Sequence, residues 1–177
     1  MCENSIFMQN ITTMKKIIYV LSFLMSFGLV AQTTYLHCGQ VFDSASGKMK
    51  KEQTIVVEGN LITAINKGYT VVESDAIQLI ELKAKTVYPG FIDMHVHIES
   101  ESNPQAYLNR YRLNEADVAY DAAVYAERSL MAGFTTVRDM GGSGVNIALR
   151  NAIAKGKIPG PRIFTAGKTL ASTGGHG

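Results

Sequence analysis

Cysteine is scarce in this chain of 177 residues, which contains only Cys2 and Cys38. We expect Cys2 to be lost with an N-terminal leader, so the mature chain keeps one cysteine and forms no internal disulfide. The residues before Cys38 lack the small side chains that precede a lipidated cysteine. This favours a structural role within a strand for Cys38 and for its neighbour His37. A scaffold held by disulfides is excluded.

An excess of charge of either sign is also missing. The chain has 17 basic and 15 acidic residues, with a formal net charge of +2. This balance does not provide the concentration of basic side chains that a nucleic-acid surface needs. Because 46% of the residues are hydrophobic, the chain can bury a core, and we expect a globular protein with no nucleic-acid partner.

A long apolar run is the third feature that is lacking. The longest one covers residues 17–31, whereas a membrane-spanning helix needs about 20 apolar residues. The run follows two lysines and ends in small residues, the pattern of a secretory signal peptide. We expect residues 1–31 to be a leader, with the natural start at Met14 and cleavage after Ala31. The mature protein would be exported to the periplasm or the medium, without a stable membrane span.

Short strands dominate residues 32–86, which we interpret as a small β domain of the sandwich type. Thr54–Glu58 and Leu61–Ile65 are separated by the two-residue turn Gly59-Asn60, a pattern typical of a hairpin. Further strands are expected at residues 35–42, 70–73 and 76–82, with a polar turn at 43–51.

Strands alternate with helices in residues 87–177, which indicates an α/β fold. An apolar strand at 87–97 precedes a helix with apolar side chains at helical spacing, which Gly133 ends. The expected elements are strands at 87–97, 134–139 and 162–166 and helices at 116–131 and 146–155. This β-α-β-α-β order predicts a parallel sheet, either open or closed into a barrel.

Two histidines end the first of these strands. Because side chains alternate along a strand, Asp93, His95 and His97 are expected on one face, with aliphatic residues on the other. Neutral imidazole nitrogens are good ligands for zinc and similar ions, so the pair predicts a metal site. Asp93 is expected to orient one of the histidines by hydrogen bonding.

Other polar residues permit more than one interpretation. Asp139 ends the second strand, where it can act in a site, pair with Arg138 or cap the following glycine loop. That loop, residues 141–144, lacks the third glycine of a dinucleotide fingerprint and any Gly-Lys-Ser/Thr, so we interpret it as a flexible active-site loop. Glu99 is expected at the surface. His176 lies between glycines, and for this residue we favour contact with the substrate over a structural role in a turn.

The segment Pro89–His97 resembles the first-strand signature of the amidohydrolase superfamily. Residues 132–139, 160–162 and 173–177 are similar to its imidazolonepropionase-related branch, which includes exported Xaa-Pro dipeptidases. The resemblance implies that residues 87–177 form about the first two and a half βα units of a (β/α)8 TIM barrel, preceded by the small β domain.

The resemblance also implies a function. His95 and His97 would bind zinc in a site of one or two divalent metal ions, and His176 would lie beside the substrate. The reaction would be metal-assisted hydrolysis of a carbon–nitrogen bond in an amide or a dipeptide, such as Xaa-Pro. The alternatives are a cyclic-amide hydrolase or deaminase of the same superfamily, and a non-catalytic exported module whose histidines are vestigial.

A barrel of this type takes about 250 residues, and residues 87–177 provide roughly a third of one. The family's further metal ligands and its general base lie on later strands, so no catalytic set is complete here. We therefore expect an N-terminal fragment that is inactive alone. Purified residues 32–177 should not hydrolyse an Xaa-Pro dipeptide with added zinc. Hydrolysis that His95→Ala abolishes would contradict this expectation.

Overall fold

The structure is a computed structural model that describes residues 32–173. The chain divides between Val87 and Tyr88 into two compact units, each of which is described by itself. The leader expected over residues 1–31, its start at Met14 and the candidate substrate residue His176 lie outside the described residues. Within residues 32–173, no helix is both long and apolar enough to cross a membrane.

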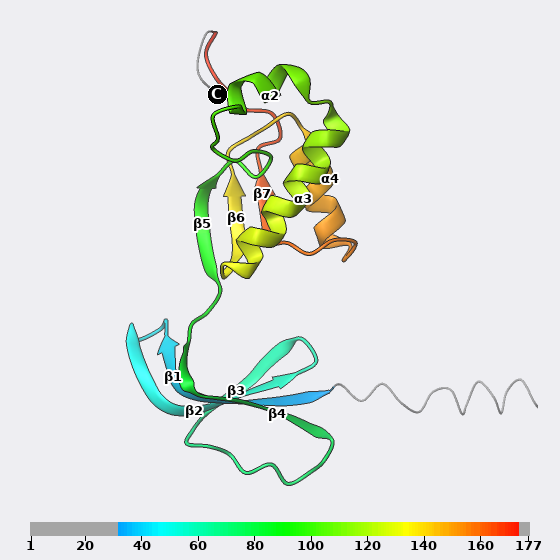
Figure 1. Ribbon diagram of the computed structural model, residues 1–177. Helices are drawn as coiled ribbons and strands as arrows, with labels where there is room; N and C mark the ends of the chain where they lie inside the picture. Colours follow the sequence, from blue (N-terminus) through cyan, green and yellow to red (C-terminus); the bar gives the residue numbers. More distant parts are fainter. Residues whose placement is uncertain (1–31, 174–177) are drawn as a thin grey trace, which may run out of the picture. The chain divides into compact units, whose positions relative to one another are not determined.

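Four strands of the first unit form one mixed sheet (Figure 1). They are β1 (Thr33–Asp43), β2 (Lys48–Glu58), β3 (Leu61–Lys67) and β4 (Ile77–Val87). Their order is β3-β2-β1-β4, with β1 antiparallel to β2 and parallel to β4. A sandwich needs a second sheet that faces the first. The described residues of this unit form a single sheet, so the sandwich expectation is not confirmed.

The hairpin predicted around Gly59-Asn60 is confirmed. Glu58 of β2 pairs with Leu61 of β3 across this two-residue turn. Gly59 has a φ of 61°, a left-handed conformation that glycine adopts without steric cost and that tight hairpin turns require.

The polar turn expected at residues 43–51 is too long, because β2 already begins at Lys48. Asp43 pairs with Lys48 across the two strands, and the Lys50 ammonium lies 2.8 Å from the Asp43 carboxylate. Hydrogen bonds from Lys50 and Ser46 lower the pKa of Asp43 to about 2. Charged cross-strand pairs thus extend a strand that has no hydrophobic alternation in its sequence.

The core of the first unit contains the one described cysteine. Cys38 is fully buried and free, and it packs with Val41 and Ile55. Burial raises the pKa of its thiol, so Cys38 behaves as a small hydrophobic side chain. The structural role expected for Cys38 is confirmed.

The strand expected at residues 70–73 is absent. Side chains of the sheet bind the backbone of this segment instead. The Thr54 hydroxyl donates to the Gly68 carbonyl at 2.8 Å and accepts from the Thr70 N–H at 2.9 Å. Because these bonds satisfy the backbone groups without a neighbouring strand, the segment remains a loop.

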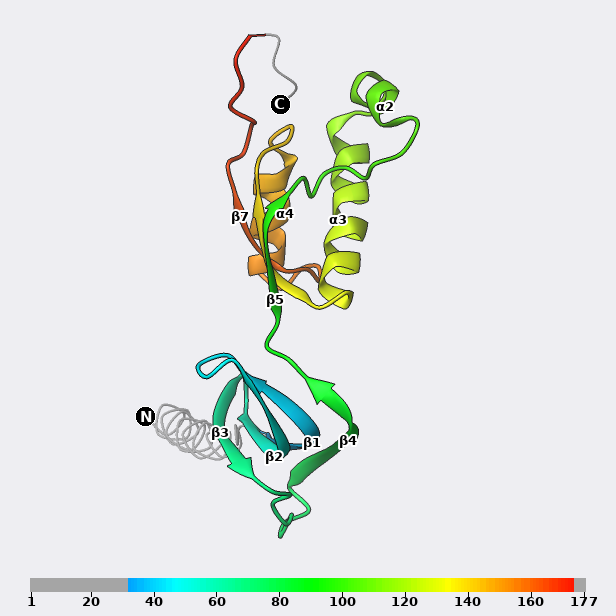
Figure 2. The same cartoon turned by 90° about the vertical axis from the view of Figure 1, so that its left-hand side faces the viewer.

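In the second unit, a parallel sheet of three strands is covered on one face by the two longer of three helices (Figures 1 and 2). The strands are β5 (Phe91–Val96), β6 (Phe134–Asp139) and β7 (Arg162–Thr165), and the helices are α2 (Ala106–Arg112), α3 (Glu115–Met131) and α4 (Val145–Ala154). The sheet order is β5-β6-β7, so the predicted β-α-β-α-β arrangement is confirmed. Helix α2 was not expected, because its sequence shows no apolar stripe. In agreement with this, none of its residues is buried.

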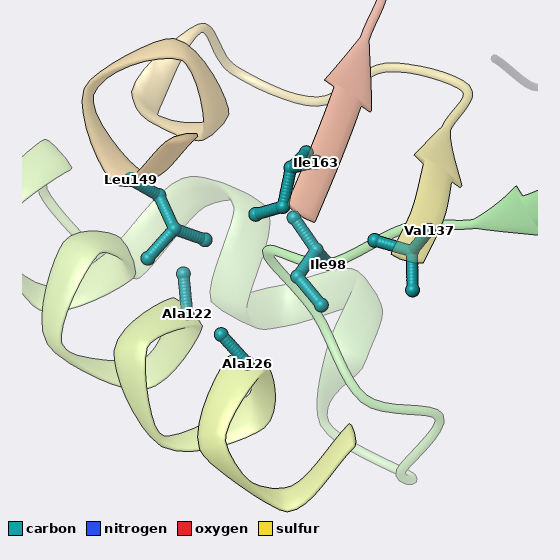
Figure 3. Packing of buried hydrophobic residues seen from close by; sticks show 6 residues of the cluster. All are labelled: Ile98, Ala122, Ala126, Val137, Leu149 and Ile163. Carbon is teal, nitrogen blue, oxygen red and sulfur yellow. The ribbon is translucent and has the colours of Figure 1, made fainter. Parts of the chain in front are cut away.

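Small side chains bring α3 close to this sheet. Ala122 and Ala126 are fully buried and pack with residues of the sheet and of α4 (Figure 3). The rest of this core consists of Ile98, Val137, Leu149 and Ile163. Alanine leaves the helix backbone near its neighbours, so the aliphatic side chains of the strands fill the space between the layers.

Both ends of α3 have local signals. The Asn114 side chain accepts from the N–H groups of Ala116 and Asp117, and the Asp117 carboxylate accepts from the Asn114 N–H. This reciprocal capping starts the helix. Gly133, with a φ of 98°, follows its end as the sequence predicts.

The apolar segment 87–97 was expected to form one continuous strand, and this expectation is wrong. Val87 ends β4, and β5 begins only at Phe91. Pro89 has no N–H group with which to join a sheet ladder. Gly90 lies so close to the Thr135 side chain that a Cβ atom there would overlap with it. Pro89 therefore interrupts the chain between β4 and β5, and Gly90 allows β5 to lie beside β6.

Asp139, at the end of β6, is buried with 1% of its surface exposed. One carboxylate oxygen accepts from the Ile98 N–H at 3.2 Å, and the other accepts from the Asn146 amide and the Thr165 hydroxyl, each at 2.7 Å. We call these bonds the Asp139 network. It joins the carboxyl ends of β5 and β7 to the first turn of α4.

Removing this carboxylate should destabilise the second unit. Asp139→Ala removes the acceptor of two buried donors, the Ile98 N–H and the Asn146 amide, and of the half-buried Thr165 hydroxyl, and each such loss costs about 1–3 kcal/mol. We expect the free energy of unfolding to fall by at least about 3 kcal/mol, measured by urea denaturation with far-ultraviolet circular dichroism. The exposed Asp121 of α3 provides the control, since Asp121→Ala should change it by less than about 0.5 kcal/mol. Equal losses would contradict the assignment.

Candidate metal site

His95 and His97 lie together at the carboxyl end of β5. Their ring centroids are 5.5 Å apart, with an angle of 69° between the ring planes. Both side chains are exposed, and His97 directly follows the last residue of the strand. The structure thus brings the two predicted ligands side by side in an accessible position.

Asp93 does not share the face predicted for it. It pairs with Val137 of β6, whose side chain is buried in the core under the helices. With Arg128 and other residues of α3, Asp93 lines a hollow of about 280 Å³ on this helix-covered side. The pairing of β5 with β6 shifts between Asp93 and Val96. This irregularity breaks the simple alternation on which the prediction depends.

Asp93 nevertheless contacts one of the histidines, through the main chain. Its carboxylate accepts a hydrogen bond from the backbone N–H of His95 at 3.0 Å. The bond stabilises the backbone at the irregular position that leads into the histidine pair. Asp93 therefore holds the segment that carries His95 and does not bind an imidazole ring.

His97 has one ring nitrogen bound and one free. Its Nδ1 lies 2.9 Å from the Gly141 carbonyl oxygen. A carbonyl can only accept, so Nδ1 carries the proton and donates it. In the neutral ring, the lone pair then lies on Nε2, for which the described residues offer no hydrogen-bond partner. Histidines that bind metals commonly have this arrangement.

The glycine loop that supplies this carbonyl is anchored on several sides, although we expected a flexible loop. The Gly142 N–H donates to the Gly167 carbonyl at 2.8 Å. The N–H groups of Ser143 and Asn146 both donate to the Glu99 carboxylate, each at 2.6 Å. These contacts fix the chain directly after the Gly141 carbonyl.

Glu99 was expected to have a surface role rather than to reach the site. It is half-buried, and its carboxylate is bound to the protein. Its two oxygens bind the loop and the first turn of α4, 44 and 47 residues further along the chain. No local pattern in the sequence indicates partners at such separations. The one feature of the sequence that is related to this contact is the glycine at position 142, where a Cβ atom would lie 2.5 Å from the Glu99 carboxyl carbon.

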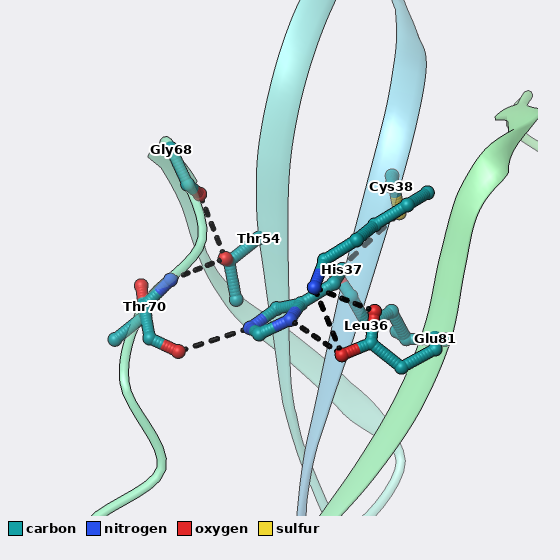
Figure 4. Close-up of polar contacts among 8 residues, drawn as sticks. Leu36, His37, Cys38, Thr54, Gly68, Thr70 and Glu81 are labelled. Carbon is teal, nitrogen blue, oxygen red and sulfur yellow. Dashed lines mark hydrogen bonds and ion pairs between the residues drawn. The ribbon is translucent and has the colours of Figure 1, made fainter.

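His37 differs from the histidine pair in burial and in its bonds (Figure 4). It is 6% exposed, its Nε2 lies 2.9 Å from the Thr70 carbonyl oxygen, and its Nδ1 lies 3.3 Å from the Glu81 carboxylate. Both nitrogens are occupied, so His37 links β1 to β4 and to the loop between β3 and β4. The structural role expected for it is confirmed.

The histidine pair suits a divalent metal ion as part of a ligand set. Catalytic zinc sites use three protein ligands and leave one position for water. Among residues 32–173, no group of three or more histidine, cysteine, aspartate or glutamate side chains is placed to hold a metal ion. Of the described residues, His95 and His97 would therefore supply two ligands of such a site. Asp93 was predicted to orient a histidine and not to bind the metal.

Comparison with known proteins finds a family match over the region that carries the histidine pair. Residues 86–176 match the model of the Amidohydrolase family. The chain is similar to the solved structure of an Xaa-Pro dipeptidase with methionine bound in its active site, with 41% identity and a TM-score of 0.73 over 81% of this chain and 35% of that one. It also resembles a prolidase complexed with N-methylphosphonate-L-proline, with 36% identity and a TM-score of 0.69 over 82% of this chain and 34% of that one.

A curated relative gives the same family. Ochratoxinase from Aspergillus niger is 30% identical over 99 residues, which are 54% of this chain and 20% of that protein. The chain thus spans only about a third of the two solved structures and a smaller share of ochratoxinase. Since the family model covers more than half of the chain, the chain belongs to the amidohydrolase family.

Proposed function

We propose that this chain carries part of the active site of a metal-dependent hydrolase of carbon–nitrogen bonds, with Xaa-Pro dipeptides as the substrate class. One observation supports this proposal above all others. The Gly141 carbonyl holds the proton of His97 on Nδ1, which leaves Nε2 free beside the ring of His95. His97 in this state, beside the exposed ring of His95, suits a metal ligand better than a structural role such as that of His37.

Each residue of the site has a role in this proposal. His95 and His97 bind the metal, and the Gly141 carbonyl orients His97. Asp93 holds the backbone of His95 through its bond to the N–H group. A divalent ion bound there would lower the pKa of a water ligand toward about 7 and polarise the carbonyl group of the substrate. Zinc suits imidazole ligands, in a site of one or two ions.

The fold supports the position of such a site. In barrels of alternating strands and helices, functional groups gather at the carboxyl ends of the strands. The histidine pair lies at the carboxyl end of β5, and the Asp139 network lies where β6 ends. We propose that β5, β6 and β7 are the first three strands of a (β/α)8 barrel, of which residues 87–177 are the N-terminal part.

The relatives narrow the substrate class. The two solved structures described above are an Xaa-Pro dipeptidase and a prolidase with a phosphonate analogue that contains proline. The signal peptide expected over residues 1–31 would place the enzyme outside the cytoplasm, where peptides are available as substrates. We therefore favour dipeptides over cyclic amides and nucleobases.

Metal binding tests the proposal directly. Titration of the full chain with Zn²⁺ should detect binding that His95→Ala and His97→Ala each weaken by at least about 100-fold, since losing a ligand costs more than losing its hydrogen-bond partner. His37→Gln provides the control, because both nitrogens of His37 are already bound. Zinc binding that is the same in all four proteins would contradict the proposal.

The substrate class needs a separate measurement. The complete product of the gene should hydrolyse Xaa-Pro dipeptides, and a chelator or His97→Ala should abolish this activity. Dipeptides with alanine in place of proline serve as the comparison. If a cyclic amide or a nucleobase were the better substrate, the dipeptidase assignment would be wrong while the metal site would stand.

A further inference from the structure

Glu99 binds the start of α4 with both oxygens of its carboxylate. One oxygen accepts from the Ser143 N–H and the other from the Asn146 N–H, each at 2.6 Å. The first N–H groups of a helix have no partner within the helix, and they carry partial positive charge. A carboxylate in this place is stabilised by charge as well as by hydrogen bonds.

Helix α4 has little capping from its own sequence. Gly144, which precedes it, has a φ of 112° and no side chain that could accept a hydrogen bond, and the Ser143 hydroxyl accepts from the Val145 N–H at 3.3 Å. By contrast, α3 is capped by its neighbours in sequence, Asn114 and Asp117. The acceptor for the next helical N–H, that of Asn146, is Glu99 in the segment that follows the histidine strand. The positions of helix and strand therefore depend on each other.

The contact is also close in space. A Cβ atom on Gly142 would lie 2.5 Å from the carboxyl carbon of Glu99 and equally near one of its oxygens. A glycine at this position lets the carboxylate reach the N–H groups behind it. A methyl group there would displace the end of the glutamate side chain, which is flexible, more easily than it would displace the loop.

The same loop determines the state of His97. Gly141 precedes Gly142 directly, and its carbonyl accepts the Nδ1 proton of His97 at 2.9 Å. On its other side, the loop is bound through the Gly142 N–H to Gly167 and through the Asn146 side chain to the Asp139 network. Two contacts tie this region to the strand carrying the histidines. The Met140 N–H donates to the Val96 carbonyl just before Gly141, and Glu99, two residues after His97, binds just after it.

We propose that Glu99 is a positioning residue for the metal site: by holding the loop at Ser143 and Asn146, it keeps the Gly141 carbonyl against His97 and so keeps Nε2 free for a metal. Glu99 does not touch the metal or the substrate in this role. The use of the free Nε2 rests on the proposed function, whereas the effect of Glu99 on the tautomer does not depend on it.

The tautomer of His97 is measurable in the metal-free protein. In the full chain with ¹⁵N-labelled histidine, at a pH where the rings are neutral, nitrogen chemical shifts and couplings report which nitrogen carries the proton. The His97 signals are assigned by their loss in His97→Gln. The unaltered protein should show a single tautomer with the proton on Nδ1.

Two variants remove the same contact from opposite sides. Glu99→Ala deletes the carboxylate, and Gly142→Ala leaves Glu99 intact but displaces it. Both should convert His97 from one tautomer to a mixture of two and should weaken Zn²⁺ binding about 10-fold, the lower end of the range for lost partners of metal ligands. Glu99→Gln, which can accept only one of the two bonds, should have an intermediate effect and covers the case in which Glu99→Ala fails to fold.

A helix cap of purely structural value provides the control. Asn114→Ala removes the cap of α3 and should lower stability without changing the tautomer of His97. The proposal is overturned if His97 keeps its proton on Nδ1 in both Glu99→Ala and Gly142→Ala, or if the unaltered protein already shows a mixture. Tautomers that shift as expected in a protein that binds no Zn²⁺ would support the role of Glu99 and contradict the proposed function instead.

Discussion

The second unit depends on one buried carboxylate. Asp139 is 1% exposed, and its oxygens must be satisfied by protein donors because water does not reach them. The donors come from the end of β5, from β7 and from the first turn of α4. A hydrophobic contact would tolerate sliding of these elements, whereas hydrogen bonds to a buried charge fix distances and directions. The edge of the sheet that carries the candidate site is therefore set by the requirement to satisfy this charge.

The candidate metal site is built outward from that edge. Asn146 joins the Asp139 network to the glycine loop, and the Gly141 carbonyl in that loop binds His97. Glu99, which follows the histidine pair in sequence, accepts hydrogen bonds from the N–H groups of Ser143 in this loop and of Asn146 in α4. The comparison with His37 shows what this arrangement achieves. His37 has both ring nitrogens occupied, whereas His97 has one nitrogen bound and the other without a partner among residues 32–173. Of these two histidines, His97 is the one whose state fits the proposed role as a metal ligand.

Local patterns predicted much of the fold. The apolar spacing of α3 and its stop at Gly133 act within a few residues, and the hairpin at Gly59-Asn60 is equally local. The cap at Asn114 is local too, although it was not predicted. The predictions failed where partners distant in sequence decide the conformation. The segment expected as a strand at 70–73 is held as a loop by side chains of β1 and β2. Asp93 lies on the unexpected face because the pairing of β5 with β6 is irregular.

The sequence by itself determined the family, the order of strands and helices and the identity of the two histidines, because motifs and periodicity are properties of neighbouring residues. The tertiary structure alone decided what state those histidines are in. The carbonyl that binds His97 and the N–H groups that bind Glu99 lie 44 to 47 residues away along the chain. Every residue has a backbone carbonyl, and every residue except proline has a backbone N–H, so the sequence does not show which of these groups will be the partner. Their effect on His97 exists only once folding has brought them into place.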